Sequence, residues 1–215
     1  MTSDKAPPSR KVTTRDRVLD AAERLLAQGS AGFSMRDLAE EAGVSFATPF
    51  NQFGSKAAIM LALSARRIAA MHARLAATAL PAAAVARVLA AVEIAASVML
   101  AAPAVNQAVM GAVGSPTDTP GHVAARSSDF WAEALGGGEG LADATRALAL
   151  AVLPGQLTVA FRGVLSFWTA GEIPDPALHP CARAAAAAVL LGFAGRGDRA
   201  ELAAILDGAT ALRRP

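Results

Sequence analysis

The residues best suited to chemistry lie between Ser34 and Lys56, in the segment SMRDLAEEAGVSFATPFNQFGSK. The segment combines hydroxyl, amide and cationic side chains, which hydrogen-bond to phosphates and to the edges of bases. Gly43 divides it, and glycine permits the positive φ that a tight turn between two helices prefers. Two short helices joined in this way form a helix-turn-helix, whose second helix can lie in the major groove of DNA.

Helices on both sides must hold this segment in place. Apolar residues at helical spacing predict a first helix from Thr14 to about Gln28. Ser34, followed three residues later by Asp37, resembles a capping box with Asp in place of the usual Glu. The second helix is therefore expected to open at Ser34 and to stop at Gly43.

A short third helix is expected over residues 46–52, and a longer fourth helix is expected to run from Ser55 towards Leu80. We expect Phe50 and Phe53 to pin the third helix against the small core, with Val44 packing there as well. The residues left pointing outward, where a groove-bound helix would meet base edges, are then Phe46, Ala47 and Thr48.

The remainder of the chain also predicts helices and shows no strand alternation. Pro81 suits the first position of a helix, and Pro154 could interrupt the longest apolar pattern. The expected helices span residues 82–102, 122–135, 141–170, 178–194 and 198–212. The predicted fold is all-α, with a three-helix N-terminal domain linked by a long helix to a larger C-terminal helical bundle. The expected parts are a flexible basic arm (1–12), a helix-turn-helix domain (13–57) and a C-terminal domain (58–215).

Composition and charge agree with this picture. Hydrophobic residues make up 53% of the 215 residues and aromatic residues only 5%, which favours helices over sheets. The net charge of +2 is unevenly spread, since residues 1–67 hold ten Lys and Arg against seven Asp and Glu, whereas residues 68–215 hold ten against eleven. A basic N-terminal part suits contact with a polyanion. In the arm, Lys5, Arg10 and Lys11 could reach a DNA backbone or minor groove.

The cysteine content, the N-terminal residues and the length of the apolar runs predict a soluble cytoplasmic protein. The single cysteine, Cys181, excludes an internal disulfide framework and fits a reducing compartment. The first residues lack the apolar core of a signal peptide. The longest clean apolar run, residues 184–194, is well short of a membrane span.

Catalytic patterns are not found. His72, His122 and His179 are widely separated, and none has a carboxylate or cysteine at metal or triad spacing. The glycine-rich run 136–140 lacks the Gly-Lys-Ser/Thr of a phosphate loop. We therefore expect no catalytic residue, no metal and no cofactor.

Four blocks of sequence point to one family. Together they resemble the N-terminal domain of the tetracycline-repressor (TetR) family of bacterial regulators, in register and without gaps over residues 13–62. The blocks are TRDRVLDAA (14–22), SMRDL (34–38), AGVS (42–45) and FGSK (53–56). The resemblance implies a DNA-binding regulator with an all-helical C-terminal domain that forms a homodimer and holds a small molecule. Family members differ beyond this region, so the resemblance assigns no residue after about residue 67.

Positions within the blocks carry expected contacts. By resemblance, Arg36 reaches a base or phosphate, where a guanidinium could pair with guanine O6 and N7. Thr48 and Gln52 match phosphate-binding positions, and Lys56 matches a lysine that meets a phosphate at a helix N-terminus, where backbone amides also attract anions. The predicted DNA-binding residues, including two serines at helix starts, are Ser34, Arg36, Ser45, Phe46, Ala47, Thr48, Gln52 and Lys56.

The third helix departs from the family pattern in four places. Phe46 replaces a residue that is often Lys or Arg, and its ring could touch a thymine methyl group. Phe50 stands where Tyr is usual, which removes a hydroxyl contact and leaves a packing role. Pro49 is tolerable only in the first turn of a helix, and Asn51-Gln52 replaces a frequent His-Tyr pair. These departures bear on affinity and on the operator sequence.

The C-terminal part is the expected sensor. An apolar pocket with a few polar groups is the default ligand site, and the low charge favours an uncharged, apolar or amphipathic effector. The aromatic candidates could equally be core residues. The candidate ligand-binding residues are His72, Met99, Asn106, Phe130, Trp131, Gln156, Phe161, Arg162 and Trp168. By resemblance, the dimer would form through helices within 141–170 and 178–194, where the small residues 182–188 suit close approach.

These expectations combine into one hypothesis and its alternatives. The chain is predicted to be a homodimeric repressor that binds a palindromic operator and is released when a small ligand stabilises a second conformation. One alternative is a DNA-binding regulator without a small-molecule effector. The other is an all-α enzyme or lipid-binding module that keeps the helical hairpin only as a scaffold.

Overall fold

The computed structural model describes residues 13–114 and 122–211. The expected N-terminal arm lies outside these residues. The chain forms two compact units, Met1–Ile59 and Met60–Pro215. Every regular element in the described residues is a helix, and one isolated bridge joins Leu141 to Ala194. The predicted all-α fold is confirmed.

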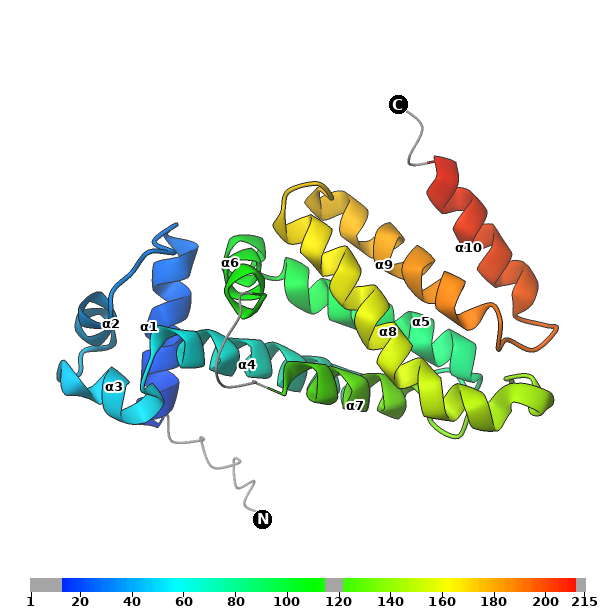
Figure 1. The fold of residues 1–215 in the computed structure, drawn as a ribbon, viewed down its shortest axis with the longest axis horizontal. Coiled ribbons are helices and arrows are strands. Elements are labelled where there is room, and N and C mark those ends of the chain that lie inside the picture. The colour runs from blue at the N-terminus through cyan, green and yellow to red at the C-terminus, as the bar shows by residue number, and fades with distance from the viewer. Residues whose placement is uncertain (1–12, 115–121, 212–215) are drawn as a thin grey trace, which may run out of the picture. The chain divides into compact units, whose positions relative to one another are not determined.

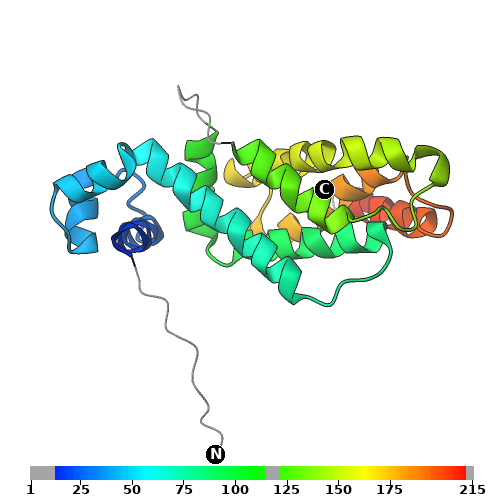
Figure 2. The ribbon, with the colours of Figure 1, turned by 90° about the horizontal axis from the view of Figure 1, so that it is seen from below.

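The N-terminal unit begins with two capped helices. Thr13 and Asp16 form a capping box at the start of the first helix, and Ser34 and Asp37 form one at the start of the second. Figure 2 looks nearly along the first helix and shows the next two packed together beside it. The helices are α1 (Thr14–Ala27), α2 (Met35–Ala42), α3 (Ala47–Phe53) and the start of α4 (Lys56–Ala77).

A small apolar core holds this unit. Val44 is half-buried behind the turn at Gly43, whose φ of 61° is the positive value that the turn was expected to require. The fully enclosed side chains come from α1, from α2 and its preceding turn, and from α4, and they include Val18, Leu19, Leu26, Phe33, Leu38 and Ile59. Because α1 and α2 carry most of this core, they form the platform on which α3 rests.

The C-terminal unit is a layered helical bundle. Helices α5, α8 and α9 run side by side, α7 packs on α5 and α8, and α10 covers α9 (Figure 1). The unit contains the rest of α4, α5 (Ala84–Leu100), α6 (Pro103–Val113), α7 (Val123–Leu135), the 3-10 turn η1 (Asp143–Thr145), α8 (Arg146–Thr169), α9 (Asp175–Leu190) and α10 (Arg199–Ala211).

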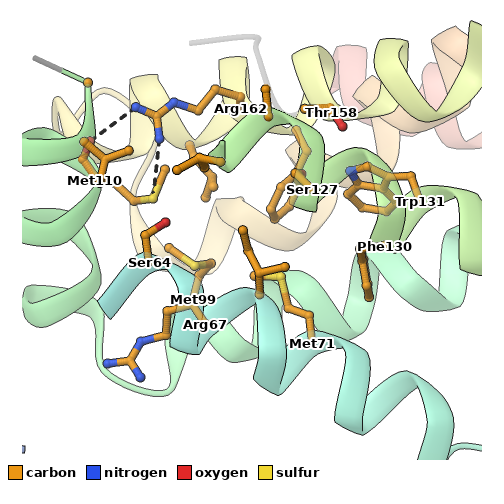
Figure 3. Close-up of a pocket in the computed structure, with 17 residues that line it drawn as sticks. Ser64, Arg67, Met71, Met99, Met110, Ser127, Phe130, Trp131, Thr158 and Arg162 are labelled. Carbon is orange, nitrogen blue, oxygen red and sulfur yellow. Dashed lines mark hydrogen bonds between the residues drawn. The ribbon is translucent and has the colours of Figure 1, made fainter. Parts of the chain in front are cut away.

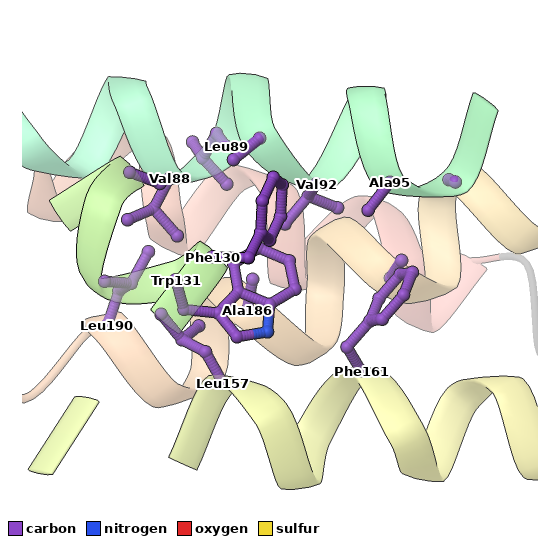
Figure 4. Packing of buried hydrophobic residues seen from close by; sticks show 14 of the residues in the cluster. Val88, Leu89, Val92, Ala95, Phe130, Trp131, Leu157, Phe161, Ala186 and Leu190 are labelled. Carbon is purple, nitrogen blue, oxygen red and sulfur yellow. The ribbon is translucent and has the colours of Figure 1, made fainter. Parts of the chain in front are cut away.

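Aromatic rings fill the centre of this bundle. Phe130 and Trp131 of α7 lie between α5 and α8, with Phe161 of α8 packed edge-on against the Trp131 ring (Figure 4). Alanines on α5 and α9 allow the helices to approach closely, which explains how an alanine-rich sequence builds a dense core.

Two proline expectations were wrong. Pro81 does not open a helix, because α5 starts at Ala84, whose N–H donates to the carbonyl of Glu139. Pro154 does not interrupt α8, which is continuous across it. Its ring is buried in the core, and the Thr158 hydroxyl donates to the Pro154 carbonyl at 2.9 Å, so packing offsets the missing helical hydrogen bond.

Candidate DNA interface and ligand cavity

Arginines of α1 fix the turn between α2 and α3. Arg17 Nη2 donates to the carbonyls of Ala42 and Gly43, both at 2.9 Å. Arg24 bonds the Glu41 side chain at 2.5 Å and the Glu41 carbonyl at 3.1 Å. The last carbonyls of a helix have no partner within it, so these two side chains complete the C-terminus of α2 and set where α3 begins.

Two further cations anchor the other ends of the motif. Arg15 Nη1 donates to the Gln52 carbonyl at 3.0 Å and stacks over the Phe53 ring at 4.2 Å. Lys56 Nζ donates to the carbonyls of Ala31 and Phe33 at 2.6 and 2.9 Å. Burial lowers the pKa of Lys56. An ammonium has three N–H donors, so Lys56 keeps one for another acceptor.

The surface of α3 is aromatic. Phe46 and Phe50 are 58% and 42% exposed, and their rings meet edge-on with centroids 5.5 Å apart. The expectation that Phe50 pins α3 was therefore wrong. Buried Pro49 and half-buried Phe53 perform that role instead, because they face the platform while Phe50 shares the outer face with Phe46.

Polar groups flank this aromatic pair. Ala47 and Gln52 are exposed, and the hydroxyls of Ser45 and Thr48 lie 2.8 Å apart at the start of α3. The predicted contact residues on α3 thus share one end of the motif with the two phenylalanines. An exposed hydroxyl pair next to an apolar patch can serve a phosphate and a base edge at once.

Arg36 differs from the other cations of the unit. Within the described residues 13–59, it is the one cation that makes neither a hydrogen bond nor an ion pair with the protein. It is exposed in the first turn of α2, beside the Ser34–Asp37 capping box. The hydrogen bonds from Ser34 lower the pKa of Asp37. Arg36 is therefore free to meet an outside acceptor.

The C-terminal unit encloses a cavity of about 370 Å³, a size typical of ligand sites. Apolar side chains dominate its wall, with a few polar groups from α4, α7 and α8 (Figure 3). Its lining is Ser64, Arg67, Ile68, Met71, Met99, Met110, Val113, Gly114, Val123, Ala124, Ser127, Phe130, Trp131, Thr158, Phe161, Arg162 and Leu165.

The structure divides the nine candidate ligand residues. Those that line the cavity are Met99, Phe130, Trp131, Phe161 and Arg162. The other four lie elsewhere: His72 pairs with Glu133 at 2.5 Å, Asn106 is buried against the carbonyls of Val98 and Met99, Gln156 is exposed, and Trp168 is buried with Nε1 donating to Asp175.

Several lining residues had no signal in the sequence. Ser64, Met71, Met110, Ser127 and Thr158 sit in ordinary helical patterns, and only the packing of α4 against α6, α7 and α8 brings them to one space. Among the residues that the structure describes, no group of His, Cys, Asp or Glu could hold a metal ion.

Comparison with known proteins agrees with this geometry. Residues 18–63 match the model of the bacterial regulatory proteins of the tetR family. A search of the curated proteins gave no match. A crystal structure of a TetR transcriptional regulator from Rhodococcus sp. RHA1 has 22% identity and a TM-score of 0.66, covering 82% of this chain and 96% of that one. A protein of unknown function from the same organism has 23% identity and a TM-score of 0.55, covering 88% of this chain and all of that one.

An all-helical chain with an N-terminal helix-turn-helix and a separate C-terminal bundle is the architecture that these findings define. The match over residues 18–63 confirms the resemblance found in the sequence: the N-terminal part of the chain is a DNA-binding domain of the tetR family of bacterial regulatory proteins.

Proposed function

We propose that this protein is a transcriptional repressor that reads its operator with α3 and the first turn of α2. The observation that carries the proposal is the division of cations in the N-terminal unit, where four hold the motif together and Arg36 is left free beside an exposed α3. A guanidinium can bond guanine bidentately, and a phenyl ring can contact thymine methyl groups. Residues 13–57 form the DNA-binding domain in this proposal, and residues 58–215 form the ligand and dimer domain.

Selection of bound DNA from a random pool tests the proposal. We expect a palindromic consensus, because a dimer presents two equal motifs to two half-sites. Arg36→Ala should relax the preference at one base pair of each half-site, by about 1–3 kcal/mol. Phe46→Ala should relax a position that is T in the consensus. If the purified protein retains no DNA selectively even at low salt, the proposal fails.

The dimer that this requires is proposed to form through α8. Its exposed side holds an uncharged stripe in which Leu148, Val159 and Phe167 are 56%, 67% and 53% exposed, with Gly155 between them. By length and composition alone, residues 143–169 could cross a membrane. A helix that packs on the core with one side and on a second copy of the chain with the other is as apolar as a membrane-spanning helix. We therefore propose that α8 is a dimer helix and that the regulator is cytoplasmic.

Sedimentation velocity tests the dimer. Val159→Glu buries a charge in the proposed interface and should give monomers with weaker operator binding. Ala76→Glu, on the exposed side of α4, is the matched control and should stay dimeric. A Val159→Glu protein that remains a dimer would move the interface off α8.

We propose further that a small molecule bound in the cavity releases the operator. Support comes from the size of the cavity and from a wall that is apolar with few polar groups. The alternative, a regulator without an effector, predicts that no compound which raises the unfolding temperature also weakens operator binding. A thermal-shift screen read together with operator binding separates the two.

A further inference from the structure

The charged groups of the cavity are of one sign. Its lining includes Arg67 and Arg162, and none of the lining residues that the structure describes is a carboxylate. For a half-buried cation such as Arg162, which faces this apolar space, a negatively charged ligand group would offset the cost of burial. Arg162 was among the candidate ligand residues, but the low overall charge of the chain had suggested an uncharged effector.

The two arginines are held differently. Arg67 Nε donates to Asn106 Oδ1 at 2.6 Å, and its guanidinium points away from the cavity (Figure 3). Among the described residues, Arg162 makes two hydrogen bonds, from Nη2 to the Met110 carbonyl at 3.3 Å and from Nη1 to the Met110 sulfur at 3.5 Å. A thioether is a weak acceptor and a guanidinium has five N–H donors. Within the described residues, Arg162 is half-buried, lacks an acidic partner and keeps most of its donors unused.

A second donor in the wall is also unused. The Trp131 side chain is 1% exposed, and its Nε1 has no hydrogen-bond partner among the residues that the structure describes. Figure 3 draws this nitrogen on the side of the indole that faces Thr158 and Ser127, within the lining. The Thr158 hydroxyl donates to the Pro154 carbonyl instead. A buried N–H without an acceptor is rare in proteins, so this one marks a place for a polar ligand atom.

The space between these donors is apolar and adaptable. Three methionines, Met71, Met99 and Met110, line it together with the rings of Phe130 and Phe161. Methionine side chains are unbranched and can fill irregular gaps, which suits a flexible or variable ligand body. The wall therefore favours a molecule with an anionic head and a long apolar body.

We propose that the ligand of this cavity is an amphipathic carboxylate, with its carboxylate on Arg162, its body among the methionines and aromatic rings, and an uncharged acceptor at Trp131 Nε1. The inference rests on the proposed ligand control and narrows its chemistry. It also replaces the uncharged effector that the composition suggested. Arg162 lies on α8, whose outer side carries the proposed dimer stripe, so one helix joins the two functions.

Calorimetric titration of the full chain with three ten-carbon probes tests the head group. Decanoate should bind, whereas decan-1-ol should bind at least about tenfold more weakly and decylamine weaker still, since a charged hydrogen bond is worth about tenfold or more. Arg162→Met should remove the advantage of decanoate, Arg162→Lys should keep part of it, and the exposed control Arg74→Met should change nothing.

Keto groups placed along the chain test Trp131. One of 4-, 6- or 8-oxodecanoate should bind about fivefold tighter than decanoate, and Trp131→Phe should abolish that gain while sparing decanoate. If no oxo isomer gains affinity, Trp131 is no part of the site.

The possible outcomes distinguish three claims, namely a carboxylate ligand, control by a ligand and binding to DNA. Equal binding of decanoate and decan-1-ol, unchanged in Arg162→Met, would overturn the carboxylate assignment and leave ligand control intact. If no probe binds while the protein still selects operator DNA, the carboxylate assignment fails, DNA binding stands, and the thermal-shift screen alone decides on ligand control.

Discussion

The two units of this protein differ in how far they depend on charged hydrogen bonds and on apolar burial. In the N-terminal unit, Arg15, Arg17, Arg24 and Lys56 donate to backbone carbonyls and tie short helices together. In the C-terminal unit, apolar area from long helices supplies the packing, with Trp131 and Trp168 almost fully enclosed. A small domain buries too little area to rely on it alone, and charged hydrogen bonds make up the difference.

This difference between the units indicates where ligands bind, because a cation with unused hydrogen-bond donors is available to an outside acceptor. Among the described residues, Arg36 of the first unit makes no hydrogen bond or ion pair with the protein, and half-buried Arg162 of the second unit has no acidic partner. Both have unused donors, and they lie where the two proposed ligands, DNA and an organic anion, would bind. The tryptophans allow the units to be followed separately, because both lie in the second unit.

The largest expected effect tests whether the stability of the second unit depends on its buried apolar area. Leu157→Ala removes a fully buried side chain from the bundle core and should destabilise that unit by about 2–5 kcal/mol. Urea unfolding followed by tryptophan fluorescence measures it. Operator DNA binding by the folded protein should be retained, and a loss below about 1 kcal/mol would mean that the core is loosely packed.

The next effect tests the carbonyl-bonding arginines of the first unit. Arg17→Ala removes two hydrogen bonds to the end of α2 and should destabilise this unit by about 1–2 kcal/mol, because the side chain is partly solvated. Circular dichroism detects the change, and tryptophan fluorescence should not. Arg36→Ala is the matched control and should leave stability unaltered. Equal stability of the two variants would contradict the division of cations.

Lys56→Ala tests a residue to which we assign both a structural role and a contact with DNA phosphate. Lys56→Ala should lower the stability of the first unit by about 1 kcal/mol, through the loss of its bonds to Ala31 and Phe33. It should also flatten the salt dependence of DNA binding by roughly one unit of slope, through the loss of one phosphate contact. A changed stability with an unchanged slope would make Lys56 purely structural.

The smallest effect concerns pH. The Ser34 hydrogen bonds lower the pKa of Asp37 from its ordinary 3.8. The unfolded state then binds more protons between the two pKa values, so this stability is complete above about pH 4 and is lost as the pH falls through the folded pKa. Thermal unfolding by circular dichroism at falling pH should show a smaller decline in Asp37→Asn than in the unaltered protein. Identical declines would assign the acid sensitivity to other groups.

Prediction from sequence succeeded best where contacts are local. The capping box of Ser34 and Asp37, the turn at Gly43 and the exposure of Phe46 all depend on residues a few positions apart. It failed on Phe50. In the seven-residue helix α3, packing against α1 and α2 decides which of Pro49, Phe50 and Phe53 faces inward. Periodicity in so short an element cannot decide which side faces inward.

The sequence by itself determined an all-α chain with a TetR-type helix-turn-helix, since caps, turns and motif blocks act over short distances. Only the tertiary structure decided which polar residues of the long helices face the cavity. Gln156 and Arg162 are six residues apart on α8, which turns them by about 240°, so one is exposed and the other lines the space. Packing between segments far apart in the sequence sets which side of α8 faces α4 and α7, and no local sequence pattern predicts it.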